Sequence, residues 1–433
     1  MPAADPRAAS GSGESGPLAP PGRPSRQDWR LVAALAVTQT IGFGVLYYSF
    51  SVLLTPMSRD LGVSTSRVSL ALTISVLVAA VSAPVVGRLL DGRGGRGLMT
   101  AGSVLGTAAL LAWSQVETVA QLYAVFAFVG VAAAMVLYEA AFAVVVARFA
   151  APARATALLA LTVVAGFASS IFMPLTGALT QAYGWRQALV VLALAYGAAA
   201  IPLHALAVRR PRTGPRIAPA ARSGAGERAA LVRAATRQPA FLLLAAAFTL
   251  HSTGVSTISV LLITYLIHLG HPPLLAASVA GLLGVLSVTG RLITTGLQRR
   301  LPAALIAAAV FALQAAAAAA LPLIGAATSG AIAAVLLFGL GFGVSTITKP
   351  HLLTERYGTT AYASLSGRLA LPATLAKAVS PAAALAVAHT AGYGWVMAGV
   401  ALSCLIASAA LAGYHRLSFR RTSNHLSGPE APA

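Results

Sequence analysis

The residues of this sequence that could do chemistry are ionisable groups set within long apolar runs. Glu139 is the one acidic residue well inside such a run, Lys377 lies near the middle of another, and Arg291 lies near the end of a third. A charged side chain at the centre of a membrane helix costs about 2.5–3.5 kcal/mol on insertion scales. Each of these residues therefore marks a binding site, a proton site or an ion pair.

Glu139 and Lys377 each have two interpretations. A carboxylate within the membrane can gain and lose a proton as its surroundings change, which would make Glu139 a proton-coupling site. Glu139 can also form a structural ion pair with a basic residue of another helix. The compact ammonium of Lys377 suits contact with a substrate anion, or it pairs with Glu139. In a coupled mechanism, protonation of Glu139 would free Lys377 for the anion.

Several other residues are candidates for substrate binding. Arg291 either contacts a ligand or anchors a helix end at the membrane surface. His251 lies among serines and threonines, so it either lines a cavity or hydrogen-bonds in a helix interface. Gln39 occupies the corresponding place in the first half of the chain, and Tyr47 either lines the cavity or belongs to an aromatic belt. Lys349 ends an apolar run and is interpreted as a surface anchor.

Composition places the chain in a membrane. The 433 residues are 58% hydrophobic and 9% charged, with a mean hydropathy of +0.80. Soluble proteins carry about 25% charged residues, so a soluble or disordered chain is excluded. The single cysteine, Cys404, excludes an internal disulfide and a cysteine-based metal cluster.

Twelve apolar runs have the length of a membrane-spanning helix. They cover residues 29–54, 67–90, 98–115, 119–147, 155–180, 187–207, 239–267, 276–297, 303–325, 330–350, 362–388 and 395–416. The polar stretch between the sixth and seventh runs contains eight arginines. The sequence thus predicts an all-α membrane protein with a disordered tail (1–28), a six-helix bundle (29–207), a basic linker (208–238), a second six-helix bundle (239–416) and a second tail (417–433).

Basic residues predict the orientation of the chain. Placing the N-terminus in the cytoplasm puts 25 basic residues on that side, three outside, and two, Arg368 and Lys377, within a span. The positive-inside rule favours this arrangement, with both termini cytoplasmic in the inner membrane of the cell. The net charge of +20 is then explained by topology and by contact with anionic lipid, which argues against a nucleic-acid partner.

The two halves contain related segments. Gly87-Arg88-Leu89 lies at the end of the second span of the first half, and Gly290-Arg291-Leu292 lies near the end of the second span of the second half. The first spans carry polar interruptions at Gln39 and His251. Matching polar interruptions in two halves point to a binding site near the membrane midplane.

The stretch 87–96 resembles the loop motif G-x-L-x-D-x-x-G-x-R of the major facilitator superfamily. The matching residues are Gly87, Leu89, Asp91, Gly94 and Arg96. This resemblance implies two pseudo-symmetric six-helix bundles that rock about a central site, with Asp91 and Arg96 locking the outward-facing state. The second copy has Thr294 in place of the aspartate, so no such lock is expected there.

Within that superfamily, two stretches resemble the bacterial monocarboxylate-porter and oxalate–formate-antiporter branch. They are residues 44–64 and Gly184-Trp185-Arg186. In the antiporters of this branch an arginine of span eight and a lysine of span eleven bind a dicarboxylate, and Arg291 and Lys377 occupy similar places. Residues 173–177 keep only the proline and one glycine of the motif typical of drug antiporters, which argues against that activity.

The sequence therefore predicts a secondary transporter of a small mono- or dicarboxylate, coupled to protons or working by exchange, as a monomer in the lipid bilayer. No phosphate loop, H-E-x-x-H or G-x-S-x-G motif occurs, so we expect no enzyme activity, no cofactor and no metal. An efflux pump for a drug or toxic metabolite is the alternative within transport. A membrane-embedded enzyme or sensor is a more distant one.

Overall fold

The computed structural model describes residues 24–208 and 224–426. The predicted tail 1–28 and linker 208–238 are only partly covered, and residues 427–433 of the second tail lie outside the described part. Helices account for nearly all of the described residues, and no strand occurs among them. Helices are expected here, because every backbone group within a bilayer must find its partner inside the protein.

The first half of the chain contains eight α-helices and one π-helical turn, labelled η1. They are α1 (Arg26–Phe43), η1 (Gly44–Tyr48), α2 (Ser49–Asp60), α3 (Thr65–Arg93), α4 (Gly95–Trp113), α5 (Val119–Val136), α6 (Tyr138–Arg148), α7 (Ala151–Ala165) and α8 (Ala168–Ala207). The second half begins with a helix in the predicted linker. Its helices are α9 (Ala225–Thr236), α10 (Pro239–His268), α11 (Pro273–Leu297), α12 (Ala303–Ile324), α13 (Thr328–Leu340), α14 (Val344–Tyr357), α15 (Tyr362–Ala391) and α16 (Tyr393–Leu426).

These helices make twelve crossings, as the sequence predicts. Ten stretches of the described residues are long and apolar enough to cross a membrane. One of them, Ala153–Ala207, has 55 residues and is broken at Gly184, whose φ of 78° is not helical, so it crosses twice. α4, with 19 residues, packs against α5 and α8 and adds the remaining crossing.

Capping side chains and glycines set several helix ends. Ser25 and Asp28 form a capping box at the start of α1, and Thr118 and Gln121 form one at the start of α5. Such boxes satisfy N–H groups that have no partner in the first turn of a helix. Gly94 has a φ of 82°, which lets the chain leave α3 and enter α4 without strain.

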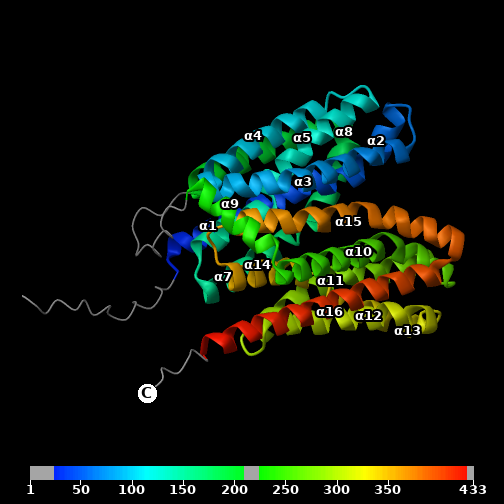
Figure 1. The fold of residues 1–433 in the computed structure, drawn as a ribbon. Helices are drawn as coiled ribbons and strands as arrows, with labels where there is room; N and C mark the ends of the chain where they lie inside the picture. The colour runs from blue at the N-terminus through cyan, green and yellow to red at the C-terminus, as the bar shows by residue number, and fades with distance from the viewer. Residues whose placement is uncertain (1–23, 209–223, 427–433) are drawn as a thin grey trace, which may run out of the picture.

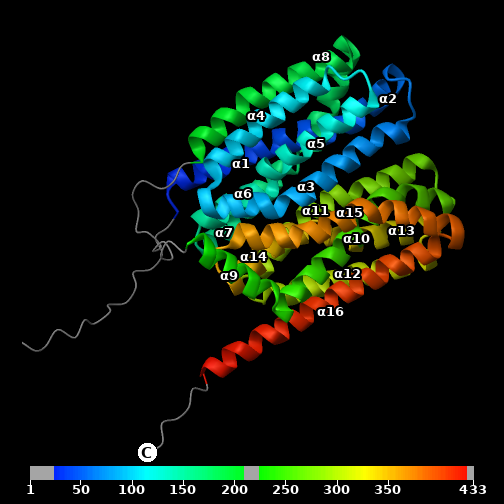
Figure 2. The ribbon, with the colours of Figure 1, turned by 45° about the horizontal axis from the view of Figure 1, so that its top comes forward.

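The helices form two bundles that lie side by side (Figure 1). Helices α1–α8 make up the N-terminal bundle and α10–α16 the C-terminal bundle, which the turned view of Figure 2 also shows apart. The start of α1, the end of α16 and helix α9 all lie at one end of the molecule. We call this the α9 end, and the opposite one the far end.

The most extensive contact between the bundles runs along α3 and α15, and we call it the α3–α15 seam. A Cβ atom on Gly87 would overlap the carbonyl oxygen of Ala363, and one on Gly367 would overlap that of Ala83. Glycine at both positions therefore brings the two helix backbones into direct contact, as small residues do in membrane helix pairs.

A second and shorter contact joins α7 to α11, and we call it the α7–α11 seam. Helix α14 also meets α6 and α7, and α15 meets α6. The far half of α15 is different, since most of the side chains between residues 382 and 390 are exposed. The bundles are thus joined in the α9 half of the molecule.

Candidate functional site

Two broken helices face each other across the bundles. The fourth span of the first half is interrupted between α5 and α6 at Leu137, whose backbone is extended (φ −80°, ψ −164°). The fourth span of the second half is interrupted between α13 and α14 at residues 341–343. Discontinuous helices at corresponding positions of two halves are the strongest structural pointer to a transporter binding site.

A break in a membrane helix frees backbone carbonyls that need donors. In the N-terminal bundle Gln39 meets this need, because its Nε2 donates to the Val136 carbonyl over 2.7 Å. The Gln39 side chain is fully buried within its own bundle. The structure therefore gives this predicted substrate-binding residue a partner inside a helix interface.

The C-terminal bundle uses two side chains for the same task. Gln314 Nε2 donates to the Phe338 carbonyl over 2.9 Å, and Gln314 Oε1 accepts from His251 Nε2 over 3.0 Å. The His251 ring stacks on Phe311 with 3.9 Å between centroids. His251 is 1% exposed, so of its two predicted placements the structure has the hydrogen-bonded one in a helix interface.

A second buried histidine was not predicted from the sequence. His204, in α8, hydrogen-bonds the Thr38 hydroxyl over 3.0 Å with Nε2 and the Ser103 hydroxyl over 2.7 Å with Nδ1. It ties the first, third and sixth spans of the N-terminal bundle together. A lone histidine close to the end of an apolar run was the only sequence signal for it.

Glu139 pairs across the bundles. One carboxylate oxygen forms an ion pair with Lys349 of α14, and the other accepts from the Ser366 hydroxyl of α15 over 2.6 Å. The predicted pairing of Glu139 with Lys377 is therefore wrong, and so is the surface-anchor role of Lys349. The reason is the break at residues 341–343. Helix α14 begins after this break, and its second turn, which carries Lys349, faces α6.

Arg291 lies at the α7–α11 seam. Its Nη1 donates to the Thr162 carbonyl of the N-terminal bundle over 3.0 Å, and its Nε donates to the Gly343 carbonyl over 3.4 Å. The hydroxyls of Tyr48 and Tyr138 lie within electrostatic range of the guanidinium. Arg291 takes part in none of the ion pairs among the described residues.

Tyr48 and Tyr138 each belong to a small group of packed aromatic rings. Tyr47 lies in η1 with its ring 5.3 Å from that of Tyr48, at an angle of 84°. Phe43 and Tyr138 lie 4.5 Å apart, and Tyr138 stacks on Phe142 at 5.1 Å. Short π-helical turns are frequent at functional sites, and this one carries two of the rings. Tyr138 was not predicted from the sequence.

Lys377 lies on α15, where Ser256 of α10 donates to its backbone carbonyl over 2.7 Å. It follows Ser366 by eleven residues, which is about three helical turns, so both residues share one face of the helix. Ser366 turns this face toward Glu139 of the other bundle. The Lys377 side chain is exposed and has no carboxylate partner among the described residues.

The loop motif closes the α3–α15 seam. The Asp91 carboxylate accepts from the backbone N–H groups of Ala363 and Ser364, over 3.0 and 2.7 Å. These groups lie at the start of α15, where the helix dipole favours a negative charge. Arg96 is exposed and forms none of the ion pairs found in the described residues.

The second copy of the motif packs inside its own bundle. Thr294 is 1% exposed, and Gly290 lies against the Leu340 carbonyl of α13. The described residues hold no group of three or more metal-ligating side chains.

Solved transporter structures share this fold. The human organic anion transporter TETRAN is 18% identical, with a TM-score of 0.66 over 90% of this chain and 100% of its own. The fucose:proton symporter FucP of E. coli is 14% identical, with a TM-score of 0.71 over 90% and 99%. A bacterial homologue of the iron transporter ferroportin, solved in an outward-facing state, is 15% identical, with a TM-score of 0.72 over 90% and 100%.

No curated protein sequence matches this chain. The sequence pattern of the Major Facilitator Superfamily matches residues 35–381, which is most of the chain and includes both broken helices. The loop motif, the twelve crossings in two bundles and this match agree, and the chain belongs to the major facilitator superfamily of membrane transporters.

Proposed function

We propose that this protein is a secondary transporter of a small organic anion. The charge balance between the bundles supports this. Glu139 is matched by Lys349, whereas Arg291 and Lys377 have no carboxylate partner in the described residues. Two unmatched cations within a membrane protein are costly unless an anion joins them. A mono- or dicarboxylate supplies the missing charge.

Glu139 is the proposed proton site. Protonation would remove the charge that holds Lys349 and would leave Ser366 without its carboxylate acceptor. Both contacts join the bundles, so their loss would loosen the α9 half. A proton arriving at Glu139 would thereby favour the opposite conformation, in which the binding site is reached from the other side of the membrane. Proton movement would then be coupled to this change of access.

The α9 end is proposed to face the cytoplasm of a cell whose inner membrane holds the protein. The basic residues support this, since most of them fall on the side of both termini. The bundles are joined at this end, so with the α9 end in the cytoplasm the structure would be outward-facing. Two structural neighbours, an organic anion transporter and a fucose:proton symporter, agree with an anion and a proton as cargo.

Uptake into proteoliposomes tests the proposal. Radiolabelled mono- and dicarboxylates are offered with and without a pH gradient, to the wild type and to Lys377→Ala, Glu139→Gln and the exposed control Arg299→Gln. We expect Lys377→Ala to abolish anion binding. Glu139→Gln should allow anion exchange that no longer responds to the gradient.

Normal anion affinity in Lys377→Ala, or wild-type pH dependence in Glu139→Gln, would overturn the corresponding role. Transport of apolar drugs with no response to any carboxylate would replace the proposal by the efflux alternative.

A further inference from the structure

Helix α9, which lies in the predicted linker, packs one face against the C-terminal bundle, where it contacts α10 and α15. On this face Val232 and Ala235 are 4% and 5% exposed. Glu227 and Arg233 lie on other sides of the helix and are exposed. Arg228 precedes Val232 by four residues, which is about one helical turn, so it shares the inward face.

The two ends of α9 reach different bundles. At its last residue, the hydroxyl of Thr236 accepts from Nη1 of Arg368 in α15 over 3.4 Å. In its first turn, Arg228 lies over the end of α3, where a Cβ atom on Gly92 would be 3.7 Å from Nη2 of this arginine. Figure 1 shows α9 beside the end of α3 and the start of α15. Helix α9 therefore bridges the α3–α15 seam at the α9 end.

The Arg228 guanidinium acts on the carboxylate that closes this seam. Asp91, which precedes Gly92, holds the start of α15 through two backbone N–H groups. Arg228 lies within electrostatic range of this carboxylate but takes part in none of the ion pairs among the described residues, so the two charges attract each other without direct contact. The family motif leads one to expect Arg96 in this role, yet Arg96 is exposed. The linker helix supplies a cation instead.

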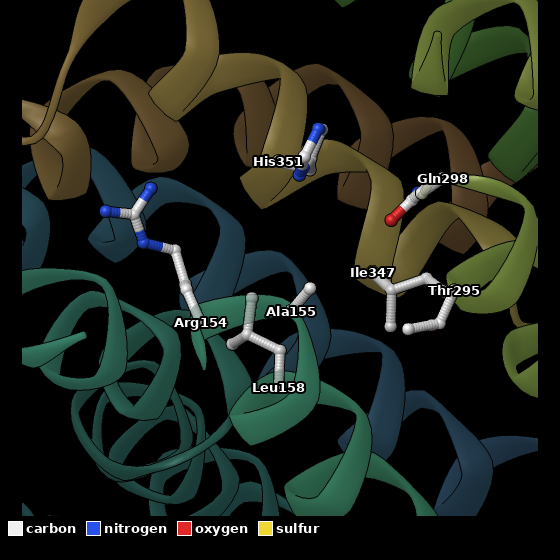
Figure 3. A pocket seen from close by; sticks show the side chains of 7 residues that line it. All are labelled: Arg154, Ala155, Leu158, Thr295, Gln298, Ile347 and His351. Atoms are coloured by element: carbon white, nitrogen blue, oxygen red, sulfur yellow. The ribbon is translucent and has the colours of Figure 1, made fainter. Parts of the chain in front are cut away.

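The other seam has a different arrangement in its α9 half. Figure 3 shows a narrow pocket there, lined by Arg154 of α7, Gln298 of α11 and His351 of α14, and its lining includes no carboxylate. Arg154 donates from Nε and Nη2 to the Phe149 carbonyl of its own bundle, over 3.2 and 3.0 Å. The arginine of this pocket thus bonds within its own bundle, whereas Arg228 faces a carboxylate of the opposite one.

We propose that Arg228 is a positioning residue for Asp91, and that helix α9 thereby takes part in locking the bundles together at the α9 end. The positive charge over Gly92 attracts the carboxylate toward the C-terminal bundle, to which α9 is attached. Opening of the α9 end would move α3 away from both α15 and α9, so it would break the backbone contacts of Asp91 and its attraction to Arg228 together. Displacement of the linker helix would accordingly favour opening.

Cysteine labelling of the purified full-length protein tests this role. The rate of maleimide labelling of Ala83→Cys, on a Cys404→Ser background, reports opening of the α3–α15 seam and needs no substrate, so it is independent of the proposed anion. Arg228→Met keeps a long side chain without the charge and should raise this rate about two- to fivefold, as expected for a partly exposed charge pair. Arg228→Lys should label like the wild type, and Arg228→Glu should label faster than Arg228→Met.

Arg233→Met is the matched control, since this arginine lies on an exposed side of the same helix. In an Asp91→Asn background the Arg228 variants should label alike, because the carboxylate charge on which they act is gone. Equal labelling in Arg228→Glu and the wild type overturns the proposal. So does an equal rise in Arg228→Met and Arg228→Lys, which would show that the shape of the side chain matters and not its charge.

Discussion

The α3–α15 seam and the α7–α11 seam occupy equivalent places in the internal repeat, yet different groups hold them together. Along the first, Gly87 and Gly367 bring two backbones into contact over a long stretch, and Asp91 caps the start of α15. The second is short, and Arg291 bridges it to the Thr162 carbonyl. One seam is close-packed, whereas the other leaves a polar pocket.

This difference shows what a repeat preserves. Both halves keep the order of spans, the break in the fourth span and a closely packed glycine in the second span, although Gly87 lies against the other bundle and Gly290 against its own. The residue one helical turn after this glycine has diverged. Asp91 of the first half reaches the other bundle, whereas Thr294 of the second half is buried in its own. The close-packed seam therefore depends on glycine, and the looser one depends on the guanidinium of Arg291.

The largest effect is expected at the ion pair between the seams. Lys349→Gln leaves Glu139 as an unmatched half-buried charge, which should destabilise the joined arrangement by about 3–5 kcal/mol. The double variant with Glu139→Gln should recover most of this loss. Thermal unfolding of the four members of the cycle measures it, and additive effects of the two substitutions would rule out the pairing.

The second largest effect is expected at the α7–α11 seam. Arg291→Ala removes two charge-assisted hydrogen bonds, each worth about 1.5 kcal/mol or more, so transport should fall about 100-fold. Arg291→Lys retains the charge without the fork and should recover only part of the rate. Equal rates in Arg291→Lys and the wild type would show that charge alone matters at this seam.

A larger side chain in place of a glycine should weaken the α3–α15 seam. Gly87→Val forces a side chain against the Ala363 carbonyl and should cost about 1–3 kcal/mol of the joined arrangement. Gly97→Val is the control, because open space surrounds that position. Maleimide labelling of Ala83→Cys on a Cys404→Ser background reports opening of the seam, and unchanged labelling in Gly87→Val would contradict the close packing.

The smallest effect distinguishes the two copies of the loop motif. Asp91→Asn keeps one acceptor but loses the charge at the start of α15, which should weaken the seam by about 1.5 kcal/mol. Transport should slow while substrate affinity stays nearly unchanged. Thr294→Val should leave labelling of Ala83→Cys as it is. A large affinity loss in Asp91→Asn would place this residue at the substrate instead.

Much of the fold could be predicted from the sequence, because length and hydropathy alone define a membrane crossing. The break at Leu137 could not, since Val136, Leu137 and Tyr138 include no helix breaker. The break at 341–343 had a signal in the closely spaced glycines of that stretch. Tertiary contacts, and not local propensity, decide the first of these breaks.

The partners in the candidate site were less predictable. Glu139 and Lys349 are 210 residues apart, and their meeting depends on how two broken helices are rotated about their axes. Hydropathy does not report that rotation. The equivalence of Gln39 and His251 was visible in the sequence, whereas their burial inside the bundles depends on which helix face each one occupies.

The π-helical turn at η1 has a consequence for how substrate preference could diverge. A π-helical turn accommodates one residue more than an α-helical turn, so it stores a single-residue insertion within an otherwise continuous span. Deleting one residue of Gly44–Tyr48 would restore α-helical geometry and leave α1 and α2 as one regular helix. The same deletion would change the relative placement of the Tyr47 and Tyr48 rings, which lie in this turn. One codon lost or gained here could therefore move two aromatic rings while the scaffold around them is retained.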